Sequence, residues 1–336
     1  MTPFGYARAS DLAEAVRLGS DPEAYYVAGG TNLVDLMKYF VEKPPRLVDI
    51  NALDLHGIEE LDGGGLRLGG LATNADTAYD LRVQARYPVL ASSILAGASA
   101  QLRNAATNGG NLNQRTRCYY FYDVETPCNK RVPGSGCGAI AGFNRIHAIQ
   151  GASEQCIATH PSDMCVALLA LDAIVHLVGA AGERTLPFAD YHRLPEEEPW
   201  RDNNRRHGEI VTAIDLPAEG YAAHHTYLKM RDRQSYAFAL VSVAAVMRVE
   251  DGVIRDGRIA MGGMAHKPWR VAEADALLAG KPIDADFGDV ADALMAGAKG
   301  QGSNDFKLDL APRAIRRACR QAAAGTPQVQ SDKRIA

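Results

Sequence analysis

Long apolar segments and a strong net charge are missing from this chain, and we expect no secretion leader. No run of about 18 residues is apolar and free of charge, so the sequence predicts no transmembrane helix. The formal net charge of −4 gives no electrostatic basis for binding nucleic acid or an anionic membrane surface. The opening MTPFGYARASDLAEAVRL has no apolar core before a cleavage site, so we expect no signal peptide.

Common cofactor motifs are absent as well. The glycine turns described below match neither the G-x-G-x-x-G fingerprint of dinucleotide-binding folds nor the Walker phosphate loop. The cysteines lack both the C-x2-C pairs of common zinc sites and the C-x2-C-x2-C run of bacterial ferredoxins. What remains is a chain of 336 residues, 47% hydrophobic and 23% charged, which is long enough for two or three domains with their own cores.

Cysteine is unevenly distributed. Four of the six cysteines share one polar stretch rich in glycine and proline: Cys118, Cys128, Cys137 and Cys156. Such a stretch has little apolar material to bury, and four thiolates on one metal centre would hold it in shape. The spacing C-x9-C-x8-C-x18-C does not select a metal, and two disulfides or chance remain alternatives. Cys165, in an apolar run, and Cys319, in a C-terminal helix, are interpreted as structural.

Two glycine turns indicate an anion site. The turn at 28–33 (AGGTNL) joins an expected strand to an expected helix, a geometry that presents backbone N–H groups and a helix N-terminus. The turn at 107–111 (TNGGN) offers the same chemistry. Either pair of glycines on its own is more often a simple bend. Together the two turns suit a diphosphate.

The order of expected elements is α+β throughout. An amphipathic helix follows Asp11, and strands and helices alternate up to about residue 110. From about Tyr221 long alternating strands predict a sheet, with Asp-Gly turns at 251–252 and 256–257. Two amphipathic helices follow, and a last helix is expected to open at Pro312 and close at Gly325.

Several of these segments carry a resemblance. In chain order, AGGTNL, RNAATNGGNL, THPSD with its following helix, YLKMRDR with FALVSVAA, and GGMAHKPWR resemble the FAD-binding medium subunit of molybdenum hydroxylases. This is the family of xanthine dehydrogenase and carbon monoxide dehydrogenase, and the resemblance covers nearly the whole chain. The segments RTRCYYFYD, PCNKR, GSGC and SEQCIATHPSD resemble its periplasmic aldehyde oxidoreductase type, whose flavoprotein subunit carries an extra [4Fe-4S] cluster.

The resemblance implies the fold and its boundaries. The expected fold class is α+β, with a p-cresol methylhydroxylase-type FAD-binding domain of two α+β subdomains. A smaller α+β C-terminal domain of the carbon monoxide dehydrogenase flavoprotein type follows. On this chain the implied parts are 1–55 and 56–219 for the subdomains, 115–157 for an iron-sulfur loop, 220–325 for the C-terminal domain and 326–336 for a tail.

The resemblance also implies which residues bind FAD. One segment would wrap around the diphosphate, and its residues are Tyr26, Val27, Ala28, Gly29, Gly30, Thr31, Asn32 and Leu33. The second subdomain would contact the diphosphate through Thr107, Gly110 and Asn111. Ile210 and Val211 match an apolar pair that packs on the flavin, and Asp163 matches an aspartate near FAD. Lys229 matches a lysine near the ring, where a cation would stabilise the anionic reduced form.

One part of the family pattern is missing. The aspartate expected after the arginine near the flavin is absent, because the chain reads RQSYAFALV there. The immediate polar partner of the ring is therefore not assigned by resemblance, and no catalytic residue is assigned.

The four clustered cysteines match the cluster ligands of the aldehyde oxidoreductase type one for one. The implied protein is one subunit of a heterotrimer, in which a molybdenum-cofactor large subunit oxidises an aldehyde and a [2Fe-2S] small subunit relays electrons. FAD on this chain would pass them to an external acceptor. No molybdenum or [2Fe-2S] signature occurs here, so this chain would not oxidise the aldehyde itself. We expect export to the periplasm with a signal-bearing partner, and otherwise a cytoplasmic location.

Two alternatives stay open from sequence. The equivalent subunit of 4-hydroxybenzoyl-CoA reductase or of xanthine dehydrogenase would carry the same glycine turns. In a zinc-stabilised scaffold protein without flavin, the cysteines would bind zinc. That alternative does not explain the two diphosphate-type turns.

Overall fold

The computed structural model describes residues 1–326, so most of the expected tail 326–336 lies outside the described residues. Its N-terminal part is a parallel sheet in the order β1 (Gly5–Arg8), β3 (Arg46–Asp49), β2 (Ala24–Val27). The connecting helices are α1 (Leu12–Gly19) and α2 (Leu33–Lys38). Of the two caps that the sequence allows for α1, Ser10 and Asp11, the structure has Asp11, which accepts the backbone N–H of Glu14.

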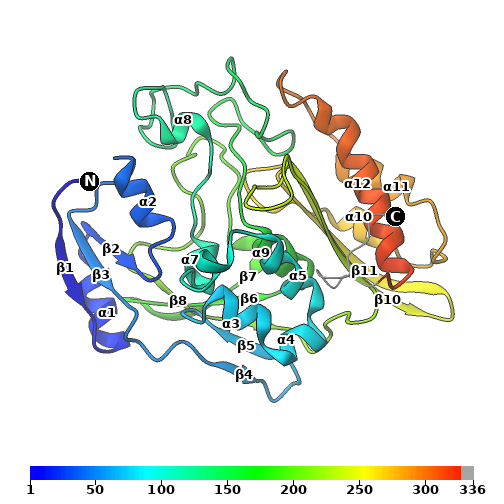
Figure 1. The fold of residues 1–336 in the computed structure, drawn as a ribbon, viewed down its shortest axis with the longest axis horizontal. Coiled ribbons are helices and arrows are strands. Elements are labelled where there is room, and N and C mark those ends of the chain that lie inside the picture. Colours follow the sequence, from blue (N-terminus) through cyan, green and yellow to red (C-terminus); the bar gives the residue numbers. More distant parts are fainter. Residues whose placement is uncertain (327–336) are drawn as a thin grey trace.

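The central part is a five-stranded antiparallel sheet covered by helices (Figure 1). Its order is β4 (Ile58–Glu60), β5 (Leu66–Gly69), β8 (Ile210–Leu216), β6 (Ile174–Gly179), β7 (Gly182–Pro187). The helical elements are α3 (Asn74–Tyr79), α4 (Leu81–Arg86), α5 (Pro88–Ala96), α6 (Ala100–Arg103), α7 (Asn108–Leu112), α9 (Asp163–Ala170) and the 3-10 turn η1 (Phe188–Asp190). Helices α5 and α9 are apolar on nearly every side because they pack between this sheet and the next.

The C-terminal part is an antiparallel sheet, β9 (His225–Met230), β10 (Val241–Glu250) and β11 (Val253–Gly262), with three helices on one face (Figure 1). These are α10 (Ala272–Ala276), α11 (Gly288–Met295) and α12 (Phe306–Ala323). The predicted turn at Asp251-Gly252 joins β10 to β11. The second predicted turn is wrong, because Asp256 and Gly257 lie within β11, where Gly257 pairs with Met247.

The start of the last helix also differs from the prediction. Pro312 lies inside α12, which begins at Phe306. A proline within a helix costs about 3 kcal/mol by losing a backbone hydrogen bond. Buried residues on both sides of it, Ala311 and Ile315 among them, pack α12 on the sheet, and this burial outweighs the lost bond. The predicted end is close to the observed one, since Gly325 follows the helix with φ +62°, a conformation that favours glycine.

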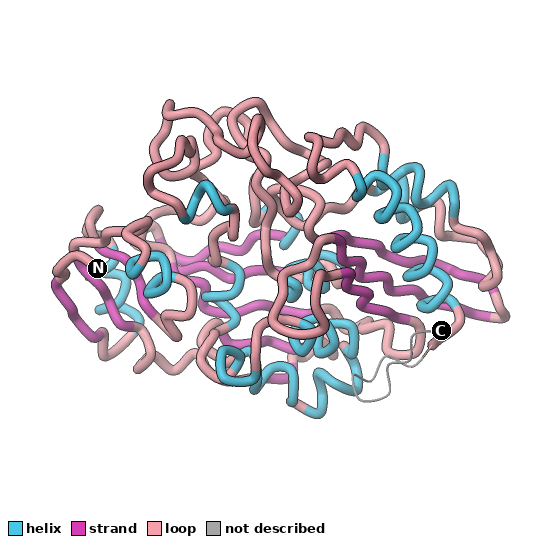
Figure 2. Tube along the Cα trace, turned by 45° about the horizontal axis from the view of Figure 1, so that its top comes forward, coloured by secondary structure: helices cyan, strands magenta, loops and turns pink. Residues whose placement is uncertain are grey.

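A long connection, residues 113–162, contains the four clustered cysteines. Its only described helix is α8 (Tyr119–Tyr122), and it arches over the molecule between the N-terminal part and the C-terminal helices (Figures 1 and 2). Backbone hydrogen bonds join it to the C-terminal part: Ile149 N–H donates to Met264 O, and Lys299 N–H donates to Ile149 O. The connection is therefore fixed at its middle as well as at its ends. Within the part of the chain that is described, no helix is long and apolar enough to cross a bilayer.

Candidate functional site

The two glycine turns lie against one cleft. A Cβ on Gly29 would sit 1.7 Å from the carbonyl oxygen of Ala105, so only glycine lets the first turn approach the segment that leads into the second. Gly30 has φ +69°, which also favours glycine. The second turn opens α7, where the Thr107 hydroxyl accepts the N–H of Gly110 at 3.1 Å. Backbone N–H groups from both turns therefore border the same space.

That space consists of two adjoining cavities, of about 380 Å³ and 790 Å³. The first is bordered by residues 26–33 together with Thr107, Gly110, Ile210 and Val211. The second is bordered by Asn111, Asp163 and Lys229. They share Gly30, Thr31, Asn32 and Gly110. Every residue predicted for FAD thus lines one cavity or the other, which is the arrangement an elongated dinucleotide needs.

Asp163 and Lys229, predicted separately, are in fact partners. Lys229 Nζ lies 2.8 Å from Asp163 Oδ2 and 3.1 Å from the carbonyl oxygen of Ala96, which it also bonds. The Tyr227 hydroxyl donates to Asp163 Oδ1 at 2.6 Å, and burial raises the pKa of Tyr227 well above its usual value, with Asp163 adding to the shift. The lysine and aspartate side chains are only 4% and 8% exposed. The cation at this edge of the cavity is therefore held in one position before any ligand binds.

Unpaired donors show that the cavities suit a ligand rich in oxygen. Asn32 Nδ2, Arg103 Nε and Arg205 Nε are buried and have no hydrogen-bond partner among the described residues, and all three side chains border the cavities. A buried donor without a partner costs about 1–3 kcal/mol. The diphosphate, ribityl and ring oxygens of FAD are acceptors of the kind these donors lack. The residues present therefore fit FAD.

The four clustered cysteines also converge. Cys118, Cys128, Cys137 and Cys156 line one small cavity, and none of them forms a disulfide in the described structure. Cys128 and Cys137 are neighbours in an isolated antiparallel bridge. Burial raises the pKa of Cys118 to about 12, and the nearby Cys156 and Cys128 contribute to that shift. Four cysteine side chains around one cavity fit a metal centre, whose positive charge would convert the thiols to thiolates.

The cations near these cysteines are mostly neutralised by other groups. Arg115 pairs with Glu42 and Asp202, Arg117 with Asp35, and Arg145 with Asp232. Burial raises the pKa of Cys156 to about 11, and Lys130 is the cation that opposes this shift. Lys130 is itself paired with Asp202, whereas Arg131 bonds the carbonyl oxygens of Tyr120 and Phe121 and has no acidic partner among the ion pairs of the described residues.

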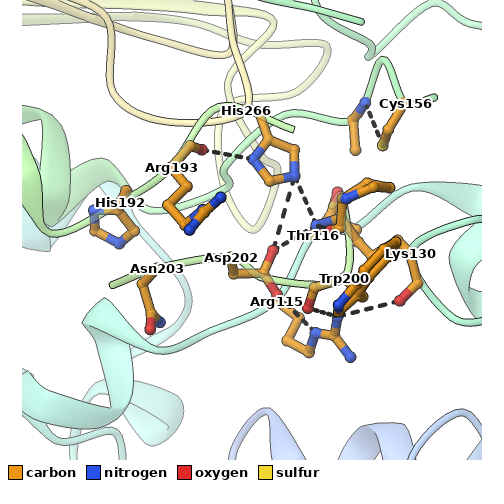
Figure 3. Close-up of polar contacts among 12 residues, drawn as sticks. Arg115, Thr116, Lys130, Cys156, His192, Arg193, Trp200, Asp202, Asn203 and His266 are labelled. Carbon is orange, nitrogen blue, oxygen red and sulfur yellow. Dashed lines mark hydrogen bonds and ion pairs between the residues drawn. The ribbon is translucent and has the colours of Figure 1, made fainter. Parts of the chain in front are cut away.

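Lys130 belongs to a buried polar network that no motif in the sequence indicates (Figure 3). Its side chain is 1% exposed, and Nζ bonds Asp202 Oδ1 at 2.5 Å, Pro199 O at 2.6 Å and His266 Nε2 at 2.7 Å. His266 Nδ1 lies 2.8 Å from the carbonyl oxygen of Arg193, so the imidazole donates there and accepts from Lys130. Burial, with Lys130 beside it, lowers the pKa of His266 to about 3. The network ties the cysteine connection to two other segments.

A second buried group lies beneath the cavities. Ligand atoms of His160, Cys165 and His192 are within 4.8 Å of one another, close enough for one metal ion. His192 Nε2 lies 2.9 Å from Leu112 O and donates to it, and burial lowers the pKa of His192 to about 4. Cys165 is fully buried in the core, as predicted. The two rings pack edge to face with centroids 4.4 Å apart, an arrangement that neutral core histidines also adopt.

Sequence comparison assigns the class of this fold and site. The FAD binding domain in molybdopterin dehydrogenase matches residues 2–219, and the CO dehydrogenase flavoprotein C-terminal domain matches residues 225–322. The chain belongs to the FAD-binding subunits of the molybdenum hydroxylase family, which are oxidoreductase subunits and do not hold the molybdenum site. The predicted family and fold class are confirmed.

Individual relatives give finer detail. The aldehyde oxidoreductase FAD-binding subunit PaoB of Escherichia coli (strain K12) is 50% identical, over 94% of this chain and 96% of its own. The glyceraldehyde dehydrogenase medium chain of Sulfolobus acidocaldarius is 27% identical over 84% of each chain. Among solved structures, the carbon monoxide dehydrogenase from Hydrogenophaga pseudoflava superimposes with a TM-score of 0.75 at 26% identity, covering 97% of this chain and 99% of that one.

Proposed function

We propose that this chain is the FAD and [4Fe-4S] electron-transfer subunit of a heterotrimeric, molybdenum-dependent aldehyde oxidoreductase. Its partners would be a molybdenum-cofactor large subunit and a [2Fe-2S] small subunit, and an external acceptor would take the electrons. The observation that carries the proposal is the convergence of four cysteines on one cavity in a chain whose other predicted residues all border an FAD-shaped cleft. The 50% identity to an aldehyde oxidoreductase subunit supports the aldehyde as substrate.

Different residues of this chain would bind different parts of FAD. Backbone N–H groups at Gly29 and Gly30 would bind the diphosphate near the junction of the two cavities, and Gly110, whose own N–H is bonded to Thr107, would lie beside it. When bound, FAD supplies two-electron chemistry that can be passed on to an acceptor. Lys229 would place its charge at the flavin half, since Asp163 fixes its ammonium group in the second cavity. Ile210 and Val211, the pair that the resemblance assigns to the flavin, line the first cavity and not the second; both are buried there and would exclude water from it.

The cysteine centre is proposed to hold a [4Fe-4S] cluster on Cys118, Cys128, Cys137 and Cys156. Its surroundings are apolar, with Phe121, Ala139 and Ile157 packed against the cysteines. His147 Nε2 lies 3.0 Å from Cys118 Sγ and would donate to the ligating thiolate. Such a site is both a support for the long connection and a redox centre. For location, we propose export to the periplasm as a folded complex with a signal-bearing partner.

One measurement separates this proposal from its rivals. The complex with its partner subunits is purified anaerobically, and its absorption spectrum is recorded together with its iron and zinc content. Flavin bands, with about four irons beyond those of the [2Fe-2S] subunit, are expected. Flavin without the extra iron would refute the cluster, and zinc in its place would favour a structural zinc site. Oxidation of the reduced flavin by 4-hydroxybenzoyl-CoA would favour the subunit of 4-hydroxybenzoyl-CoA reductase, and reduction of the flavin by a purine instead of an aldehyde would favour that of xanthine dehydrogenase.

Cysteine variants test the ligand set. Cys137→Ala is expected to remove the iron of this subunit, because three thiolates leave one iron without a protein ligand. Cys319→Ala is the matched control, since Cys319 is fully buried in the core of the C-terminal part and lies outside the cysteine cavity. Unchanged iron in Cys137→Ala, or equal loss in both variants, would contradict the assignment.

A further inference from the structure

An open groove of about 660 Å³ adjoins the second cavity. Most of its lining is aromatic or apolar: Tyr39, Tyr119, Tyr122, Val124 and Phe238, with Arg117 beside them. These residues come from the end of α2, from the cysteine connection around α8, and from the segment between β9 and β10. Tyr39 is 57% exposed and Phe238 is 48% exposed, so the rings face solvent in this chain. An exposed aromatic surface of this kind needs an occupant.

The groove is continuous with the cavity that holds Lys229. Arg117, Tyr119 and Phe238 line both spaces. A molecule in the groove would therefore lie next to whatever occupies the flavin half of the cleft. Arg117 Nε sits at this junction, buried and with no hydrogen-bond partner in residues 1–326, so it supplies a donor for a carbonyl oxygen.

The walls of the groove are held in fixed positions. The Arg117 guanidinium lies 5.8 Å from the centroid of the Tyr122 ring and 5.2 Å from that of Phe238. It donates to Asp35 Oδ2 at 3.1 Å and to the Tyr122 hydroxyl at 2.5 Å. Tyr39 packs edge to face on Tyr122, with ring centroids 5.5 Å apart. Rings that are already ordered lose little entropy when a flat aromatic molecule packs against them.

The charged residues that line the groove favour a neutral electron acceptor over an anionic one. Arg117 is the one cation in the lining, and Asp35 already pairs with it. The other charged lining residues are acidic, Asp123 and Glu125. A nicotinamide dinucleotide would bring two phosphates to this acidic rim, and the groove includes no glycine turn to bind them. A neutral aromatic oxidant meets no such penalty.

We propose that this groove is the binding site for the external electron acceptor, and that the acceptor is a quinone-type molecule. The inference rests on the function proposed above, because it requires reduced FAD in the adjoining cavity. The quinone takes two electrons and one proton from the anionic reduced flavin, which returns to its oxidised form. The quinone takes a second proton from solvent and leaves as the hydroquinone. Arg117 Nε–H would donate to one quinone oxygen, and Tyr39 with Tyr122 would pack on the ring.

Tyr39 gives the sharpest test because it lines the groove and not the flavin cavity. In the intact complex, with FAD content measured for each variant, reduction of 1,4-benzoquinone and of ferricyanide is followed with saturating aldehyde. Tyr39→Ala is expected to raise the KM for benzoquinone about three- to twelve-fold, the range for losing one aromatic packing contact. The KM for ferricyanide, a small inorganic oxidant without a ring, should not change. Tyr39→Phe should behave as the unsubstituted protein.

Tyr79→Ala is the matched control, because Tyr79 is 58% exposed on α3 and lines neither the groove nor the two cavities. It should leave both KM values unchanged. An unchanged benzoquinone KM in Tyr39→Ala, or an equal rise for both oxidants, would overturn the inference. So would equal effects of Tyr39→Ala and Tyr79→Ala.

A direct binding measurement distinguishes failure of this inference from failure of the proposed function. Calorimetric titration of the oxidised complex with 2-naphthol, a flat aromatic that does not oxidise the flavin, should show one site that Tyr39→Ala weakens. Absence of binding would overturn the groove assignment even if aldehyde reduces the flavin normally. Failure of aldehyde to reduce the flavin under anaerobic conditions would instead refute the proposed function, while the titration would still report on the groove.

Discussion

Two deeply buried histidines predict that this protein loses stability in mild acid. His192 and His266 are 3% and 4% exposed, and burial lowers their pKa values to about 4 and about 3. In the unfolded chain both imidazoles would titrate near 6.5. Between these values the unfolded state binds more protons than the folded state, so stability falls as the pH decreases from about 6.5.

The magnitude follows from those pKa values. At pH 5 the unfolded imidazole is almost fully protonated and the folded one almost fully neutral, which costs about 2 kcal/mol for each histidine relative to pH 8. The two together reach about 4 kcal/mol. With a urea dependence of about 1–3 kcal/mol per molar, the unfolding midpoint should drop by at least about 1 M. Protonated His266 would also lie against the ammonium group of Lys130.

The assay is urea unfolding of the complex at pH 8 and pH 5, followed by protein fluorescence. His266→Gln keeps an acceptor for Lys130 but does not titrate, so it should remove its own share of about 2 kcal/mol, while the lowered pKa values of His147, His160 and His192 maintain the rest of the pH dependence. His56→Gln is the control, because His56 is exposed and should leave the dependence intact. Equal midpoints at both pH values in the unsubstituted protein would refute the reasoning.

Three further predictions concern other buried positions. Gly29→Val should abolish FAD binding, because a Cβ there meets Ala105 O, whereas Gly63→Ala, with open space around it, should retain the flavin absorbance. Asp202→Asn should destabilise the protein by about 3–5 kcal/mol in urea unfolding, since it leaves Lys130 buried without a counter-charge; a loss under 1 kcal/mol would contradict this. Burial lowers the pKa of Lys307 to about 7, so stability should rise between pH 7 and 10 as the unfolded chain keeps the proton longer, and Lys307→Met should flatten that rise.

Local patterns in the sequence predicted those parts of the site that depend on neighbouring residues. The turns at 28–33 and 107–111 can be recognised from a few consecutive residues, and Gly30 needs glycine locally for its positive φ, but the need for glycine at position 29 comes from Ala105 in a distant segment. The Asp-Gly pairs show the limit of such reasoning. Asp251-Gly252 is a turn, but Gly257 lies inside β11, where Leu278 packs so closely that a Cβ would sit 2.9 Å from its side chain. That contact comes from a distant segment.

Pairings across long separations could not be predicted. Lys229 and Asp163 were each assigned to the flavin site, but nothing in the chain indicates that residues 66 positions apart form an ion pair. Lys130 contacts His266, 136 positions away, and Asp202 lies in a polar segment with no motif. A buried polar network of this kind forms only when distant segments of the chain pack together. The spacing of single polar residues in the sequence does not indicate which of them will meet.

The attachment of residues 113–162 to both ends of the molecule constrains the order of maturation. Arg117 anchors this connection to Asp35 at α2, and Ile149 anchors it to Met264 in the C-terminal part. The cysteine cavity therefore takes its final shape only after segments more than 200 residues apart have docked. If the proposed cluster binds there, its loading would be coupled to the docking of the segments that also form the flavin cleft, even though no cysteine lines that cleft.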